Sequence, residues 1–98
     1  MIRLELSGFV ESDLDDIAAY IAQDNPLRAV TFVREIRATF RTIQSNPLMY
    51  QLRPDIGDEA RMATTGRYVI LFRIDHDTLR IERIVYGSRD LPAALDPS

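Results

Sequence analysis

The stretch RYVILFRI at residues 67–74 constrains the fold more than any other part of the sequence. Its centre, YVILF, is apolar at every position and too short for a typical helix, which favours a central β-strand. Gly66 precedes the stretch, and the turn-forming sequence DHDT follows it at residues 75–78. Residues 79–86, LRIERIVY, therefore predict the returning strand of a hairpin.

Side chains of a strand alternate between its two faces, so residues 67–74 divide into two sets. The wholly apolar set is expected to pack on helices, and it contains Tyr68, Ile70, Phe72 and Ile74. The other set has two arginines that bracket two aliphatic residues, and it contains Arg67, Val69, Leu71 and Arg73. We interpret this second face as an open sheet surface that receives an anion or a partner. Arg83 falls in phase with apolar residues of the returning strand, which predicts either a β-bulge or a buried partner for this arginine.

The first half of the chain predicts one strand and two helices. Residues 2–6 alternate apolar and charged side chains, as a half-buried strand does. Ser7 then occupies the N-cap position of a helix predicted over residues 8–22, whose apolar side chains recur with helical spacing. A second amphipathic helix is predicted over residues 26–45, with Asn25 as its cap and proline as its first residue. Because the link is so short, the two helices should form an antiparallel hairpin.

The remaining segments complete the fold class. Residues 46–60 contain two of the five prolines and predict an ordered loop, and residues 60–65 predict a short strand. One strand, two helices and three strands make an α+β fold of order βααβββ, with the helical hairpin packed on one face of a small antiparallel sheet. Residues 1–90 are expected to form a single domain. Residues 91–98 form a C-terminal tail, predicted as a short helical turn or a frayed end.

Composition excludes several classes of function. The chain has no cysteine, which removes disulfides, thiolate metal sites and cysteine nucleophiles. All 12 basic residues are arginine, so the chain holds anions with fixed positive charges but has no lysine to act as a general acid or base. The net charge of −3 argues against a dedicated nucleic-acid binder. The first residues lack the apolar run of a signal peptide, and no stretch reaches membrane-spanning length, so we expect a soluble cytoplasmic protein.

Four segments together resemble the ParE branch of the ParE/RelE toxins of type II toxin–antitoxin systems. They are DLDDIAAYIAQDNPLRAVTFVREI, NPLMYQLRPDIG, RYVILFRID and IERIVYGSRD. The likeness extends from about Leu4 to Asp90 in the family's order. It implies the βααβββ fold and a toxin that blocks bacterial growth unless a cognate antitoxin covers it. ParE-like members are associated with inhibition of DNA gyrase, whereas RelE-like members cleave messenger RNA on the ribosome, and fold alone does not choose between them.

Ribonuclease chemistry requires proton carriers as well as positive charge on the phosphate. If the chain were a ribonuclease of RelE type, the residues that would carry this chemistry are Arg61, Arg67, Arg73, Tyr86 and Arg89. Tyr86 stands where many ParE-like sequences have histidine, but an unperturbed tyrosine titrates near a pKa of about 10. The only histidine, His76, lies in the predicted hairpin turn. We therefore expect no catalytic residues and a protein inhibitor that binds its target through Arg67, Arg73, Tyr86 and Arg89.

The resemblance also implies a protein partner. The expected antitoxin is ParD-like, with a ribbon-helix-helix N-terminus and a C-terminal segment that folds over the toxin. The residues expected to bind it are three apolar ones and three arginines of the second helix: Leu27, Val30, Leu48, Arg34, Arg37 and Arg41. The arginines would otherwise form a solvated face or pair with acids of the first helix. We expect no cofactor and no metal, because Asp13, Asp15 and Asp16 are typical of an acidic helix start. A third alternative is a degenerate toxin that only binds its antitoxin and helps repress its operon.

Overall fold

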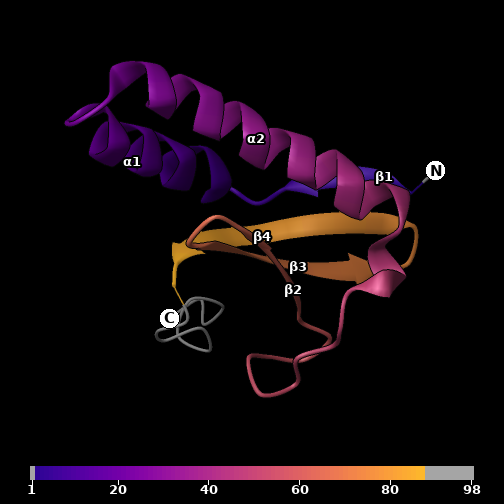
Figure 1. The fold of residues 1–98 in the computed structure, drawn as a ribbon. Coiled ribbons are helices and arrows are strands. Elements are labelled where there is room, and N and C mark those ends of the chain that lie inside the picture. The colour runs from indigo at the N-terminus through magenta and orange to yellow at the C-terminus, as the bar shows by residue number, and fades with distance from the viewer. Residues whose placement is uncertain (1, 88–98) are drawn as a thin grey trace.

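The computed structural model describes residues 2–87, so the predicted tail and Arg89 lie outside the described residues. The elements are β1 (Arg3–Leu6), α1 (Val10–Ala22), α2 (Pro26–Ser45), the short 3₁₀ helix η1 (Pro47–Met49), β2 (Arg61–Thr65), β3 (Tyr68–Asp75) and β4 (Thr78–Tyr86). Both α-helices lie on one side of the sheet, and the loop after η1 passes to the other side (Figure 1). The predicted α+β fold is confirmed. Within residues 2–87, no helix is long and apolar enough to cross a membrane.

The sheet is mixed, with the strand order β1-β4-β3-β2. Strands β2, β3 and β4 are antiparallel as predicted, whereas β1 pairs with β4 in parallel. The expectation of a wholly antiparallel sheet is therefore wrong at this edge. After the helical hairpin, the chain enters the sheet at β2, which is the edge opposite β1. Strands β3 and β4 then follow in antiparallel order towards β1. Strand β4 consequently runs in the same direction as the first strand of the chain.

The main core lies between the helices and the sheet. Its largest fully buried side chains from the helices are Leu14, Ile36 and Ile43, and those from β3 and β4 include Ile70, Phe72, Leu79 and Ile81. The face of β3 predicted to meet the helices does so, because Tyr68 and Ile74 pack at the edges of the same cluster. Each fully buried large apolar side chain contributes about 1.5–3 kcal/mol relative to its exposed state. This core fixes the sheet under the helical hairpin.

The two helix starts differ in how well the sequence predicted them. Asn25 caps α2 as expected, because its side chain accepts a hydrogen bond of 3.0 Å from the backbone N–H of Arg28. Ser7 does not cap α1, which begins at Val10. Its buried hydroxyl instead donates to the carbonyl of Glu82 at 2.5 Å. Ser7 therefore fastens the end of β1 to β4, and the extra residues before α1 form a turn.

The second face of β3 is covered rather than open. Val69 and Leu71 are buried against Ile56 and Ala60 of the loop between η1 and β2. The sequence-based interpretation of an open face is wrong at these two positions. The physical reason is that a strand with apolar residues on both sides leaves a second apolar surface, and the long loop between η1 and β2 buries it.

Arg83 satisfies both alternatives left by the sequence. Leu71 is opposite Arg83 whereas Phe72 is opposite Ile81, so β4 has a bulge that contains Glu82. Arg83 also forms a two-point ion pair with Asp13 of α1, with both N···O distances at 2.9 Å. The hydrogen bond with Asp13 raises the pKa of Arg83. The buried N–H of Ile84 donates to the same carboxylate at 3.0 Å, so this pair locks the start of α1 onto β4.

Candidate binding surfaces

A row of aromatic rings crosses the end of the sheet that carries the β2–β3 turn. Tyr68 and Tyr86 are cross-strand neighbours, and their ring centroids lie 5.4 Å apart in an edge-to-face arrangement. Phe32 of α2 continues the row at 5.6 Å from Tyr68. The guanidinium of Arg28 lies 5.0 Å from the Phe32 centroid. Such pairs contribute about 0.5–1.5 kcal/mol beyond their buried area, so the rings are held in fixed positions.

The β2–β3 turn brings Arg67 to this row. Gly66 adopts a φ of 60°, which favours glycine, and a Cβ there would lie 3.2 Å from the Phe32 ring, which is a tight contact. The carbonyl of Arg67 accepts a hydrogen bond of 2.7 Å from the N–H of Gly87, which ties the turn to the end of β4. Side-chain hydrogen bonding with Tyr86 raises the pKa of Arg67 above its ordinary value. The predicted residues Arg67 and Tyr86 are therefore neighbours.

Two further phenols complete this surface. Burial is the main cause of the raised pKa of Tyr68, with smaller contributions from the phenols of Tyr20 and Tyr86. Tyr20 and Tyr86 are 67% and 56% exposed, so they present their hydroxyl groups to solvent. We call Tyr20, Arg67, Tyr68 and Tyr86 the phenol–arginine cluster. It offers hydrogen-bonding groups on a rigid apolar base, which suits recognition of a partner, whereas the raised pKa of Tyr68 disfavours a phenolate base.

The other predicted target residues lie elsewhere. Arg61 is opposite Phe72, and it lies about 13 Å along β2 from the closing pair of the turn at 3.3 Å per residue. Its guanidinium donates to the carbonyl of Tyr50. His76 sits in the β3–β4 turn with a φ of 58° and a side chain 92% exposed, as predicted. Among the described residues predicted for a ribonuclease site, only Arg67 and Tyr86 therefore lie next to each other.

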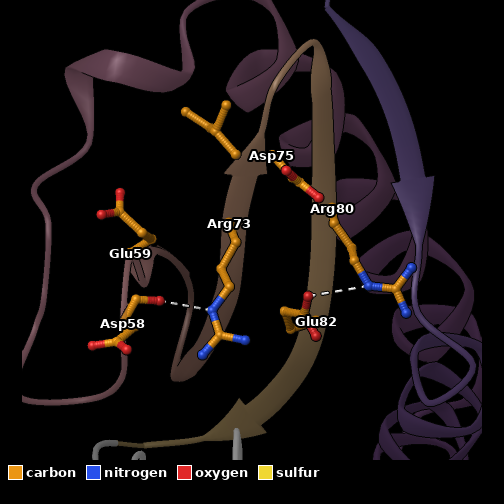
Figure 2. A pocket seen from close by; sticks show the side chains of 7 residues that line it. Asp58, Glu59, Arg73, Asp75, Arg80 and Glu82 are labelled. Carbon is orange, nitrogen blue, oxygen red and sulfur yellow. Dashed lines mark hydrogen bonds and ion pairs between the residues drawn. The ribbon is translucent and has the colours of Figure 1, made fainter.

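Arg73 lines a separate charged pocket of about 540 Å³ on the sheet face away from the helices. The pocket is lined by Asp58, Glu59, Arg73, Ile74, Asp75, Arg80 and Glu82 (Figure 2). Arg73 donates from Nε to the carbonyl of Asp58 at 2.9 Å, and it lies opposite Arg80 in the sheet register. Arg80 is paired with Glu82 at 3.1 Å and with Glu5. Four carboxylates therefore outweigh the two arginines, and no cluster of metal-ligating side chains occurs among the described residues.

An apolar groove of about 480 Å³ runs between the ends of the two helices that are joined by the short link. Its lining is small and aliphatic: Ala18, Ala19, Ala22, Pro26, Ala29, Val30 and Val33. Leu27 and Val30 are 74% and 55% exposed beside it. Leu48 is also exposed but belongs to η1, which follows the end of α2 at Ser45, about 22 Å from Val30 along the helix axis at 1.5 Å per residue. The predicted apolar set is therefore two separate surfaces.

The three arginines of α2 also have different environments. Arg37 pairs with Glu11 of α1 at 2.8 Å, and this hydrogen-bonded contact raises the pKa of Arg37. Arg34 and Arg41 are exposed and form no ion pair with any of residues 2–87. The expected pairing of this face with acids of the first helix is thus observed for Arg37, while two arginines stay available.

Comparison with known proteins places this architecture in a family. Residues 4–91 match the family model of the ParE toxin of the type II toxin–antitoxin system parDE. The chain belongs to the ParE toxin family. No curated protein matches the sequence.

Two solved structures resemble this ParE-family chain. One is described as the chromosomal ParDE toxin–antitoxin system from P. aeruginosa; it aligns with a TM-score of 0.78 and 23% identity over 90% of this chain and 98% of the other. The other is from the toxin–antitoxin complex RelBE2 of Mycobacterium tuberculosis, with a TM-score of 0.56 and 24% identity over 87% of this chain and 96% of the other. At these identities the two likenesses establish the fold. The protein is a toxin of a type II toxin–antitoxin system.

Proposed function

We propose that this toxin inhibits growth in the bacterial cytoplasm by binding DNA gyrase and trapping its cleaved complex with DNA. The observation that carries the proposal is the dispersal of the residues predicted for a ribonuclease site: of the three predicted arginines within residues 2–87, only Arg67 lies beside Tyr86. Arg61 donates to a backbone carbonyl, Arg73 lies in a pocket of excess negative charge, and His76 contacts Asp75 in an exposed turn. A surface of this kind is suited to holding a partner rather than to cutting a phosphodiester.

The phenol–arginine cluster is the proposed contact with gyrase. Its exposed hydroxyl groups and the Arg67 fork sit on packed rings, and such rigid aromatic and arginine groups are enriched among residues that dominate binding energy. Arg73 and Arg89 were expected to join it from the sequence. The pocket around Arg73 is distinct from the cluster, and Arg89 lies outside the described residues, so we propose Arg67 and Tyr86 as the primary contacts.

A ribosome-dependent ribonuclease of RelE type is the second candidate. The specific observation in its favour is that Arg67 lies beside Tyr86, which brings a positive charge for a phosphate and a hydroxyl group together on one surface. In this case Tyr86→Phe would abolish RNA cleavage, since the Tyr86 hydroxyl would be the proton carrier beside Arg67.

We propose that a ParD-like antitoxin neutralises the toxin and that one of its helices occupies the apolar groove of α1 and α2. The groove is lined by alanines and valines, which allow close approach of a helix, and Leu27 and Val30 offer exposed apolar contacts beside it. Leu48 lies beyond the end of α2, which is about 22 Å from Val30 along the helix axis, so an antitoxin that touches both surfaces must extend along α2.

Supercoiling by gyrase from the same organism tests the primary proposal. The wild-type toxin should inhibit supercoiling and accumulate cleaved DNA, and Arg67→Ala should weaken inhibition at least about tenfold. Arg34→Ala is the matched control, because Arg34 is exposed on α2 and lies outside the cluster. Gyrase that remains fully active at a large molar excess of toxin would refute the proposal.

A further inference from the structure

The helical hairpin carries apolar and charged residues at different levels of one face. At the level of the short link, this face is the apolar groove of about 480 Å³, to which α1 contributes three alanines. Asp15 precedes Ala18 by three residues and Ala19 by four, and Arg34 follows Val30 by four. Residues three or four apart in a helix lie on the same side. Asp15 and Arg34 therefore continue the groove along α1 and α2, and we call them together with the groove residues the hairpin face.

Asp15 and Arg34 carry charges of opposite sign that find no partner within one copy. Both are exposed, and neither forms an ion pair with any of residues 2–87. Asp15 lies about 11 Å along α1 from Ala22, and Arg34 lies about 12 Å along α2 from Pro26, at 1.5 Å per residue. Because Ala22 and Pro26 flank the link, the two charges lie at the same level of the hairpin, one on each helix.

A second copy of the chain complements this face when a two-fold axis parallel to the helices relates the two copies. The helices α1 and α2 run side by side in opposite directions (Figure 1). Such an axis keeps each residue at its own level and places α1 of one copy over α2 of the other. The apolar grooves then cover each other, and Asp15 of each copy faces Arg34 of the second copy, so both free charges acquire a partner. A two-fold axis across the helices would instead place the acidic start of α1 on the alanines of the second copy.

We propose that, in the absence of its antitoxin, this toxin forms a two-fold dimer through the hairpin face. Helix α1 is about 20 Å long and each helix is about 10 Å wide, so the face covers roughly 400 Å² on each copy. The total of roughly 800 Å² is smaller than in stable complexes, which predicts a dissociation constant in the micromolar range. The dimer occupies the groove proposed for the antitoxin, so the two assemblies exclude each other. That exclusion rests on the proposed neutralisation, whereas the dimer does not.

Sedimentation equilibrium of the purified toxin tests the dimer. The wild type should dimerise with a dissociation constant of about 1–100 μM. Asp15→Arg and Arg34→Asp should each weaken dimerisation at least about tenfold, because like charges then face each other, and the double variant should restore it to within about threefold. Val30→Asp should also weaken dimerisation at least about tenfold, because it places a charge in the apolar groove. The control Asp75→Arg makes the same charge change as Asp15→Arg, in a side chain that is 82% exposed at the end of β3, and should leave dimerisation unchanged.

Recovery of dimerisation in the double variant supports the Asp15–Arg34 contact, since a folding defect in either single variant would not be repaired in this way. A toxin that stays monomeric up to about 500 μM, or that dimerises equally well with Val30→Asp, overturns the dimer through this face. Loss in both single variants without recovery in the double variant also overturns it. An antitoxin that binds the intact dimer overturns the exclusion. An antitoxin that does not bind the toxin at all refutes the proposed neutralisation and leaves the dimer standing.

Discussion

The ion pair between Asp13 and Arg83 should be the polar contact on which stability depends most. Replacing Asp13 with alanine removes both hydrogen bonds of the Arg83 fork and leaves the buried N–H of Ile84 without its acceptor. Breaking a buried ion pair costs about 3–5 kcal/mol, and an orphaned buried donor costs about 1–3 kcal/mol. The Arg83 side chain is 29% exposed, so water recovers part of this energy. We expect a net loss of about 3 kcal/mol in the free energy of unfolding.

Urea unfolding of three variants isolates this effect. Glu11→Ala breaks the pair with Arg37, in which both side chains are largely exposed, and should cost less than about 1 kcal/mol. A double variant with Asp13→Leu and Arg83→Met removes both charges together and should recover most of the loss. Equal losses for Asp13→Ala and Glu11→Ala, at matching denaturant slopes, would refute the reasoning that burial makes the Asp13 pair important.

Three other predictions follow from local geometry. Gly66→Ala should lower the free energy of unfolding by about 1–2 kcal/mol, because φ is 60° and the new Cβ would meet the Phe32 ring. Gly8→Ala, whose Cβ would have nothing within 4 Å, should have little effect in the same urea titration. The hydrogen bond to Arg37 lowers the pKa of Glu11 in the folded state, which stabilises the fold by at most about 0.5 kcal/mol. This stabilisation is present above the pKa of Glu11 in the unfolded chain and is lost as the pH falls through its pKa in the folded protein. Glu11→Gln should therefore flatten the pH–stability curve below about pH 5. Val30→Asp should weaken antitoxin binding, measured by calorimetry, at least about tenfold. Ala38→Asp, exposed on the same helix but outside the groove, should leave binding unchanged. Equal affinities of the two variants would rule out the groove as the docking site.

The order of elements was predictable because hydrophobic periodicity and turn chemistry are local signals. The apolar run of β3 indicated a central strand, and Asn25 with Pro26 located the start of α2. The cover over Val69 and Leu71 was not predictable in the same way. Ile56 and Ala60, which provide it, lie in an irregular loop with no periodicity to indicate a buried face.

Long-range pairing explains the remaining differences. Arg83 lies in phase with apolar residues of β4, which indicated an irregularity there. Its partner Asp13 is 70 residues away in the sequence, where it is typical of an acidic helix start, so the pairing was not predictable. Tyr20 and Tyr68 escaped notice as binding residues for a similar reason. Tyr68 lies in phase with the core face of β3, and Tyr20 lies off the apolar stripe of α1, so only the folded chain brings them beside Tyr86.

Incubation of the purified toxin with programmed ribosomes, followed by mapping of messenger RNA ends, tests most directly whether the molecule acts by binding. The account predicts no fragments above background at toxin concentrations that inhibit gyrase. Codon-phased fragments that appear with wild-type toxin and vanish with Tyr86→Phe would contradict it and establish the ribonuclease alternative.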